Sequence, residues 1–468
     1  EGGSNASTVF AGMGLAALFK FVVDGLKVIP SVITVPLKAF KTELSAEVYP
    51  ALLGVGYICG PKIASYMFAG GLIGWFVLIP AIITFGGSTI LYPGTKTIAD
   101  MYAAGGASAI WSSYIRYIGA GAVAAGGIIS LIKSLPLIVR TFADAIKGMK
   151  GAGNSNSAVR TEADLDMRVI GIGVLIMIIA IWLLPEIPVS PLGAVIIALF
   201  GFFFATVSSR MVGIVGSSNN PVSGMAIATL LFSTLCLKVT GDTGVHGMKG
   251  AIAIGSVICI IAAMAGDTSQ DLKTGYILGA TPKKQQIGEL IGAVVSAVTI
   301  GGVLVLLDSA WGFGTTELAA PQATLMKMII EGVMEGNLPW ALVFIGVFIA
   351  IVVEILGISV LPVAIGLYLP LELSATIMIG GVIRWFVDKK KADREENKDA
   401  NSGILFCSGM IAGEGLVGIL LAILAVVNVS SVFDLSGSIN LGNAGGVILM
   451  LLMILSLLKF SIWNKKKA

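Results

Sequence analysis

The chain has 468 residues, of which 56% are hydrophobic and only 12% are charged, and its mean hydropathy is +0.95. Soluble proteins carry about 25% charged residues, so this composition argues against a soluble globular protein. The net charge of +3 is too small to suggest nucleic acid as a partner. We therefore expect an all-α, polytopic transmembrane helix bundle in a lipid bilayer. Because the chain opens with Glu1 and not Met, it reads as a fragment or a processed chain.

A membrane-spanning helix needs about 20 mostly apolar residues, and segments of this kind recur along the whole chain. The candidates are Tyr66–Phe85, Ser108–Ile132, Val169–Leu184, Leu192–Val207, Met225–Leu237, Ala251–Ala265, Ile287–Leu307, Trp340–Leu356, Ala375–Val387, Ile404–Val427 and Val447–Trp463, with Ala6–Val28 and Val48–Ile58 less clear. Several are short enough for re-entrant or broken helices. The sequence thus predicts a multi-pass integral membrane protein.

Two parts of the chain resemble each other. Gly54–Val77 aligns with Ala364–Val387 at a constant offset of 310, and a Trp-Phe-Val triplet falls in register. Two shorter matches accompany it, Lys20–Leu26 with Lys327–Val333, and Gly119 and Gly121 with Gly413 and Gly415. Internal repeats are typical of secondary transporters. We predict repeat units at about residues 1–150 and 318–468, linked by 151–317, within a single transmembrane domain.

A polar, glycine-rich stretch interrupts the apolar segments at Gly213–Gly224, which reads GIVGSSNNPVSG. Ser and Asn are good helix N-caps, and Pro suits the first helical turn. A helix that begins at membrane depth offers free N–H groups to an anionic group. The candidate substrate-binding residues here are Ser217, Ser218, Asn219, Asn220 and Pro221. The alternative is a tight turn between two spanning helices.

Further substrate-binding candidates lie in two other places. The segment Gly266–Leu290 connects two apolar spans and carries Asp271, Lys273, Gln285 and Gln286. A solvated loop is the alternative interpretation of that segment. Tyr57 and Tyr368 occupy nearby places in the two repeat copies, each in a segment interrupted by Gly or Pro. Paired interrupted segments are what a central transport site requires.

Three carboxylates lie within or beside apolar runs, namely Glu354, Glu372 and Glu414. Ionisable groups inside membranes are costly and are functional candidates for that reason. Desolvation raises the pKa of a carboxyl group, as proton coupling requires. We expect these three residues to be the proton-coupling candidates. Glu354 lies deepest in its run, whereas the other two could reach the interface from positions near helix ends.

The sequence gives little support for metal or enzyme chemistry. It holds a single histidine, His246, and four cysteines that are scattered in apolar stretches, namely Cys59, Cys236, Cys259 and Cys407. No zinc or disulfide spacing is visible. We therefore expect no metal site, no cofactor and no enzymatic activity, because an intramembrane hydrolase needs a nucleophile–base pair or a metal cluster.

Several long motifs resemble the oligopeptide transporter (OPT) family. They include GIVGSSNNPVSGMAIATLL, DTSQDLKTGYILGATPKKQQIGELIG, ILGISVLPVAIGLYLPLELSATIMIGG and LLGVGYICGPKIASYMFAGGLIGW. The resemblance covers nearly the whole chain and is closest to prokaryotic-type members, which implies a bacterial inner or plasma membrane. It implies a chain that lacks the family's N-terminal part.

The resemblance implies a secondary active transporter, driven by protons, for short peptides or peptide-like metal chelates. Its partners would be a small peptide or peptide-like substrate, protons and lipid, and it could form a homo-oligomer. A membrane channel remains an alternative, as does a carrier of metal–siderophore-type complexes. No periodic filter sequence of the kind that channels use is visible.

Overall fold

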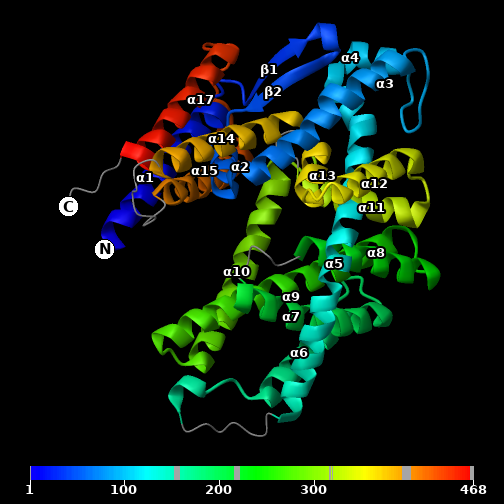
Figure 1. The fold of residues 1–468 in the computed structure, drawn as a ribbon, viewed down its shortest axis with the longest axis vertical. Coiled ribbons are helices and arrows are strands. Elements are labelled where there is room, and N and C mark those ends of the chain that lie inside the picture. The colour runs from blue at the N-terminus through cyan, green and yellow to red at the C-terminus, as the bar shows by residue number, and fades with distance from the viewer. Residues whose placement is uncertain are drawn as a thin grey trace. The chain divides into compact units, whose positions relative to one another are not determined.

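The computed structural model describes residues 2–151, 159–215, 222–315, 318, 320–392 and 402–463 (Figure 1). Helices make up nearly all of its regular structure, which confirms the all-α expectation. The chain divides into two compact units. Unit 1 comprises residues 1–123, 303–319 and 339–468, and unit 2 comprises residues 124–302 and 320–338.

Unit 1 contains most of the helices from the two ends of the chain. Its N-terminal elements are α1 (Gly2–Lys20), η1 (Phe21–Gly25), β1 (Val32–Leu37), η2 (Lys38–Phe40), β2 (Thr42–Glu47), α2 (Pro50–Leu72), η3 (Ile73–Leu78), α3 (Ile79–Gly86), α4 (Ile98–Ile110), η4 (Trp111–Ile115) and the start of α5 (Arg116–Gly151). Its C-terminal elements are α12 (Trp340–Ile355), α13 (Val360–Tyr368), α14 (Leu371–Ala392), α15 (Ser402–Val426), α16 (Ser430–Phe433), α17 (Gly442–Leu458) and η7 (Lys459–Trp463).

Unit 2 holds the middle of the chain. It contains the rest of α5, η5 (Arg160–Glu162), α6 (Met167–Leu183), α7 (Pro191–Val215), α8 (Val222–Val239), α9 (Gly244–Leu278), most of α10 (Pro282–Ala310) and α11 (Pro321–Glu335). Within it, α9 packs against α7, α8 and α11.

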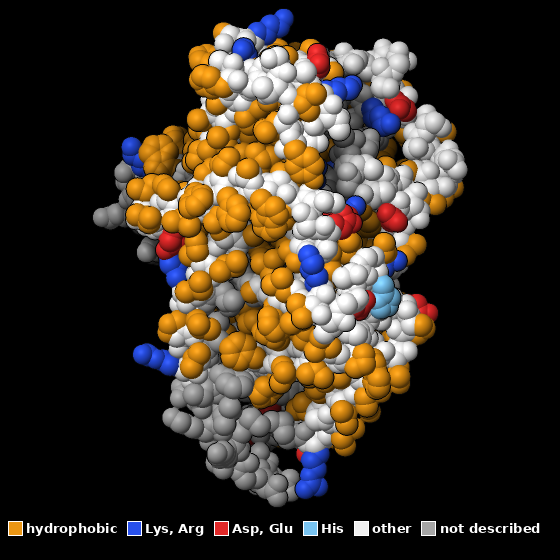
Figure 2. Space-filling view, turned by 90° about the vertical axis from the view of Figure 1, so that its right-hand side faces the viewer, with side chains coloured by type: hydrophobic (Ala, Val, Ile, Leu, Met, Phe, Trp, Pro, Cys, Tyr) orange, Lys and Arg blue, Asp and Glu red, His pale blue; other side chains and the backbone are white. Residues whose placement is uncertain are grey.

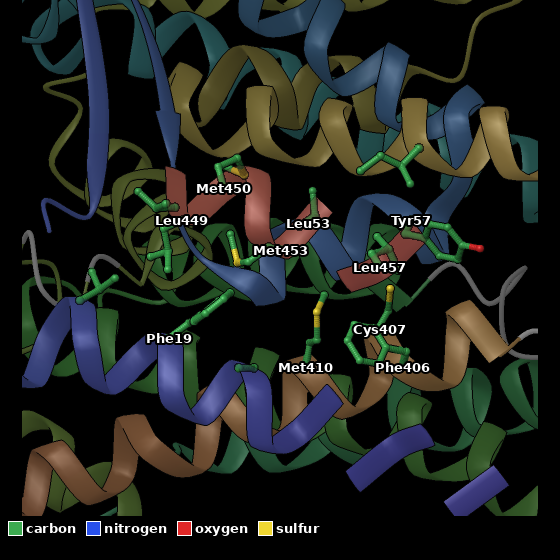
Figure 3. Packing of buried hydrophobic residues seen from close by; sticks show 14 of the residues in the cluster. Phe19, Leu53, Tyr57, Phe406, Cys407, Met410, Leu449, Met450, Met453 and Leu457 are labelled. Atoms are coloured by element: carbon green, nitrogen blue, oxygen red, sulfur yellow. The ribbon is translucent and has the colours of Figure 1, made fainter. Parts of the chain in front are cut away.

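The core of unit 1 joins helices that are far apart in sequence. Figure 3 shows Phe19 of α1 and Leu53 and Tyr57 of α2 facing side chains of α15 and α17, among them Met410 and Met453. Leu53, Tyr57, Met410 and Met453 are fully buried. Unbranched methionine side chains fill irregular gaps between helices, so this core holds the two ends of the chain together.

A β-hairpin interrupts the helices of unit 1 and was not expected from the sequence. β1 and β2 pair antiparallel, with Val32 opposite Glu47 and Leu37 opposite Thr42. The run Val-Ile-Thr-Val in β1 is rich in β-branched residues, which favour strands. The hairpin places Glu47 at its base, directly before α2.

Both copies of the strongest sequence repeat are broken helices. α2 kinks at Gly60, whose φ of 82° lies in the region that favours glycine. Pro61 follows and removes a backbone donor from the helix. In the other copy, α13 ends at Tyr368 and α14 starts at Leu371, with Pro370 between them. The 310-residue offset places Gly60 on Pro370, so the two breaks coincide. The two predicted spans Val48–Ile58 and Tyr66–Phe85 belong to one helical run, Pro50–Gly86.

The two broken helices pack against each other through glycines. A Cβ at Gly56 would collide with the backbone of Ile377, and a Cβ at Gly366 would collide with the backbone of Met67. Each contact maps onto the other when 310 is added to the lower residue number and subtracted from the higher one. A second reciprocal pair is Gly70 against Val363 and Gly380 against Leu53. Leu53 meets Gly380, and three residues further along α2 Gly56 meets Ile377, so α2 and α14 run antiparallel.

Seven helices of the described part are long and apolar enough to cross a membrane. They are Ala6–Gly25, Pro50–Gly86, Pro191–Gly213, Gly244–Leu278, Pro282–Ala310, Ser402–Val426 and Gly442–Ile462, and three shorter apolar helices are Arg168–Leu183, Gly224–Val239 and Trp340–Ile355. Apolar side chains dominate the face drawn in Figure 2. Large exposed residues such as Phe85, Val298 and Ile355 fit a lipid-facing surface. The expectation of a multi-pass integral membrane protein is therefore supported.

Candidate functional site

Four carboxylates and one lysine of unit 1 gather near the base of the hairpin. Lys20 ends α1, Asp24 lies in η1, Glu47 ends β2, Glu372 lies in the first turn of α14, and Glu414 lies in α15. We call these five residues the carboxylate cluster. Its members come from distant parts of the chain, and Asp24, Glu372, Glu414 and Lys20 all act electrostatically on Glu47.

One side of the carboxylate cluster is an ion pair. Lys20 Nζ lies 2.6 Å from Asp24 Oδ2, four residues further on. The Tyr49 hydroxyl donates a 2.8 Å hydrogen bond to Asp24 Oδ1. Lys20 Nζ also lies 3.8 Å from the centre of the Tyr49 ring, within the range of a cation–π interaction. Lys20 and Asp24 largely neutralise each other, which leaves three further carboxylates in the cluster.

Glu372 and Glu414, both predicted from the sequence, have defined partners. Ser45 Oγ donates to Glu372 Oε2 at 3.1 Å, so the hairpin contacts the start of α14. The Ala51 N–H donates to Glu414 Oε2 at 2.7 Å. Ala51 lies in the first turn of α2, where backbone N–H groups lack helical partners and favour negative charge. Glu414 therefore caps α2 from another helix.

Glu47 is the member of the carboxylate cluster whose carboxyl has a strongly raised pKa. The pKa of its carboxyl is raised from 4.5 to about 8, chiefly by burial and next by the charge of nearby Glu372, while Lys20 acts in the opposite direction. The charged form of a buried carboxyl is disfavoured both by desolvation and by like charges. Glu47 can therefore bind or release a proton near neutral pH. Glu47 was not predicted as a site residue, although it lies only three residues before the apolar helix α2.

The third predicted coupling residue, Glu354, lies elsewhere. It is in the last turn of α12 and is half-buried, next to the exposed Ile355 and Leu356. It is not among the groups that act on Glu47. The structure thus brings together Glu372 and Glu414 but not Glu354.

The two predicted tyrosines are buried in separate surroundings of unit 1. Tyr57 is fully buried in α2, and the guanidinium carbon of Arg384 lies 5.2 Å from its ring centre. Tyr368 is 2% exposed and its hydroxyl accepts a hydrogen bond from Arg116. Arg116 was not predicted as a site residue, although it is a lone arginine within the predicted span Ser108–Ile132. A charged residue inside an apolar run is a signal that could have identified it.

The predicted residues between α9 and α10 belong to unit 2. Gln285 Nε2 donates to the Asp271 carbonyl at 3.0 Å. Gln286 accepts from the Leu165 N–H at 3.0 Å and donates to Asp164 at 3.1 Å. The exposed Lys273 lies over the Tyr276 ring. Gln286 thus connects the segment after η5 to the start of α10, and Gln285 connects the start of α10 to α9.

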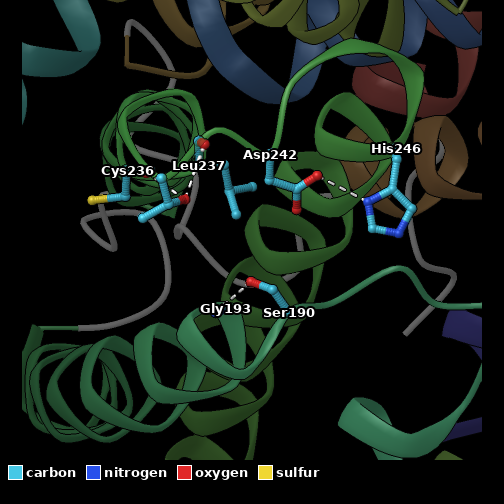
Figure 4. Close-up of polar contacts among 7 residues, drawn as sticks. Ser190, Gly193, Cys236, Leu237, Asp242 and His246 are labelled. Carbon is cyan, nitrogen blue, oxygen red and sulfur yellow. Dashed lines mark hydrogen bonds and ion pairs between the residues drawn. The ribbon is translucent and has the colours of Figure 1, made fainter.

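The remaining predicted residues, Ser217, Ser218, Asn219, Asn220 and Pro221, lie outside the described residues. Among the residues that the structure describes, no group of three or more His, Cys, Asp or Glu residues is placed to hold a metal ion. Near the start of α9, His246 Nδ1 lies 2.9 Å from Asp242 Oδ1, four residues earlier (Figure 4). This contact belongs to an exposed turn of unit 2.

The profile of the OPT oligopeptide transporter protein family matches residues 5–425. A Haemophilus influenzae protein provisionally named an oligopeptide transporter is 29% identical over 92% of this chain and 74% of its own length. A rice protein provisionally named a metal–nicotianamine transporter is 23% identical over 85% of this chain and 59% of its own length. A yeast protein provisionally named an oligopeptide transporter is 25% identical over 81% of this chain and 58% of its own length.

The chain thus spans less than two thirds of the length of the rice and yeast relatives. No solved structure matches the fold. The family profile covers most of the chain, including the broken helices and every member of the carboxylate cluster. The chain therefore belongs to the OPT oligopeptide transporter protein family.

Proposed function

We propose that the protein is a proton-coupled secondary transporter of oligopeptides or peptide-like metal chelates. The observation that carries the proposal is the carboxylate cluster, in which Glu47 has a pKa of about 8. A carboxyl that titrates near neutral pH can load a proton on an acidic side of a membrane and release it on a more alkaline side. Glu372 and Glu414 would tune that affinity through their charge.

The broken helices support a transporter that works by alternating access. Helices that break within the membrane are typical of the substrate and ion sites of secondary transporters. Gly60–Pro61 and Pro370 would provide such breaks in the two repeat copies. Because α2 and α14 correspond in sequence and run antiparallel, the two copies would have opposite orientations in the membrane.

Two further glycine contacts extend the proposed repeat to the helices α1, α5, α12 and α15. Gly12 of α1 meets the backbone of Phe406, and Gly346 of α12 meets the backbone of Ile118. This pattern favours a correspondence of α1 with α12 and of α5 with α15. The Lys327–Val333 match would then be incidental, because that segment lies in α11 of unit 2.

The substrate class follows from the relatives' names, two of which refer to oligopeptides and one to metal–nicotianamine. Both kinds of substrate carry amine and carboxylate groups. The two classes can be separated by uptake of labelled di- to hexapeptides into proteoliposomes, with and without competing iron chelates. If unlabelled peptides reduce the uptake of labelled peptide and chelates do not, the protein is a peptide carrier. If chelates reduce it and unlabelled peptides do not, the protein is a chelate carrier.

A channel is the second candidate and makes a different prediction. A proton-coupled carrier concentrates its substrate when a pH gradient is imposed, and it loses this ability when the gradient is collapsed. A channel only equilibrates its substrate and gives large unitary currents in bilayer recordings. Uptake that never exceeds the external concentration under a pH gradient would overturn the proposed function.

A further inference from the structure

Two tryptophans of unit 1 hold buried indole N–H groups that lack a hydrogen-bond acceptor. Trp75 lies in η3 and is 1% exposed, and Trp111 begins η4 and is half-buried. Among the described residues, neither Nε1 atom has a hydrogen-bond partner. A buried donor without an acceptor destabilises a folded protein. Two such donors on neighbouring side chains can bind an acceptor from outside the chain.

The two indoles are held next to each other. Their rings stack with centres 6.5 Å apart and planes 25° apart. Each ring is carried by a π-helical turn, and the turns η3 and η4 contact each other. Single π-helical turns are rare and occur frequently at functional sites. The backbone is therefore irregular in both of the turns that carry the stacked indole rings.

A cation lies beside this pair. The guanidinium carbon of Arg116, the first residue of α5, is 5.9 Å from the centre of the Trp111 ring. Arg116 also donates a hydrogen bond to the hydroxyl of the buried Tyr368. A guanidinium has five N–H donors in a planar fork whose geometry matches the two oxygens of a carboxylate.

Close packing fixes these residues relative to one another. A Cβ at Gly119, three residues after Arg116, would collide with the backbone of Tyr368. A Cβ at Gly74 would lie 3.2 Å from Ile115 and 3.3 Å from Leu367, the neighbour of Tyr368. The elements η3, η4, α5 and α13 thus converge at one place, and α13 ends there at the break before Pro370.

We propose that the indole N–H groups of Trp75 and Trp111, together with Arg116, form a binding site for a carboxylate group of the transported substrate. The two oxygens of a carboxylate accept hydrogen bonds from several donors, and a guanidinium supplies the opposite charge. Tyr368 positions Arg116. This inference rests on the proposed function for the identity of its ligand, because peptides and peptide-like chelators carry carboxylates.

The test is nuclear magnetic resonance of the full chain in detergent, with ¹⁵N-labelled indole rings. The chain has seven tryptophans, and Trp75→Phe and Trp111→Phe assign the two resonances. Trialanine is the probe, and trialanine amide is the matched control that lacks the carboxylate. We expect trialanine to move both assigned resonances downfield in a saturable manner, and we expect the amide to leave them in place.

Further variants separate a binding role from a structural one. Arg116→Gln should weaken the trialanine response about tenfold or more, as expected for the loss of one charged hydrogen bond, while Arg116→Lys should retain part of it. Trp385→Phe is the matched control, because Trp385 is the 310-residue counterpart of Trp75 and is 53% exposed. This variant should bind trialanine like the wild type. If either tryptophan variant fails to fold, the indole resonances of the site are identified as those that shift in the Arg116→Lys spectrum, because Arg116 lies beside the Trp111 ring.

Uptake measured on the same preparation distinguishes this inference from the proposed function. If peptides are taken up while both indole resonances stay unchanged with trialanine, the carboxylate site is wrong and the transporter stands. If the indoles respond but no uptake occurs, the site stands and the transporter is wrong. A response to chloride alone, or an equal response to trialanine and its amide, would also overturn the site.

Discussion

Replacing Glu47 with glutamine should remove a pH dependence of stability that the wild-type protein shows. The pKa of the Glu47 carboxyl is raised from 4.5 to about 8, chiefly by burial. The native state therefore binds this proton more tightly than the unfolded state does. The resulting stabilisation is complete below about pH 4.5 and is lost as the pH rises through 8.

The size of the effect follows from the two pKa values. At 1.36 kcal/mol per pH unit, the change from 4.5 to about 8 corresponds to at most about 5 kcal/mol between the two ends of this window. Glutamine resembles the protonated form in shape and carries no charge. The Glu47→Gln variant should therefore lose little stability on going from pH 5 to pH 9, while the wild type loses several kcal/mol.

The assay is thermal unfolding of the purified protein in detergent between pH 5 and pH 9. Glu43→Gln is the matched control, because Glu43 lies on the same strand and its carboxylate accepts a 2.8 Å hydrogen bond from Ser108 in an exposed setting. This control should keep the wild-type pH profile. Equal pH profiles for wild type and Glu47→Gln would refute the argument that Glu47 is the proton-binding group of the cluster.

Three further predictions concern packing and hydrogen bonds. Glu414→Ala leaves the Ala51 N–H in α2 without its acceptor and should lower the stability by about 1–3 kcal/mol; an unchanged melting temperature in detergent would argue against the cap. Gly56→Ala and Gly366→Ala should each destabilise the protein strongly, because a Cβ meets backbone at both sites, whereas Gly418→Ala, where the space is open, should have little effect in the same melting experiment. Gln286→Ala removes two hydrogen bonds to residues 164 and 165 and should speed hydrogen exchange at the Leu165 amide; unchanged exchange would show that those bonds do not hold the segment.

The membrane helices could be predicted because hydropathy is a property of local composition. All the apolar segments singled out in the sequence fall on helices of the structure. The hairpin could not be predicted in the same way, because Val32–Glu47 mixes β-branched and charged residues over a length too short to span a membrane. The separation of Val48–Ile58 from Tyr66–Phe85 in the sequence coincides with the break at Gly60, because Gly60–Pro61 disfavours a continuous helix locally, although both segments belong to one helical run.

The carboxylate cluster was predicted in part. Glu372 and Glu414 stood out because they interrupt apolar runs, and the structure brings both near Glu47. Glu47 itself lies in the polar hairpin, and its pKa depends on helices more than 300 residues away in sequence. Such a shift arises from tertiary packing, so local sequence carries no sign of it. Arg116, in contrast, had a visible signal as the lone arginine of an apolar segment.

The central claim is that proton movement and substrate movement are coupled in this protein. The most direct measurement is substrate-driven proton influx into proteoliposomes that contain a pH-sensitive dye. With no imposed pH gradient, adding an inward peptide gradient should acidify the lumen of wild-type vesicles. Vesicles with Glu47→Gln should take up peptide without acidification, while Glu43→Gln should behave like the wild type. Peptide uptake by the wild-type protein with no change in luminal pH would contradict the account.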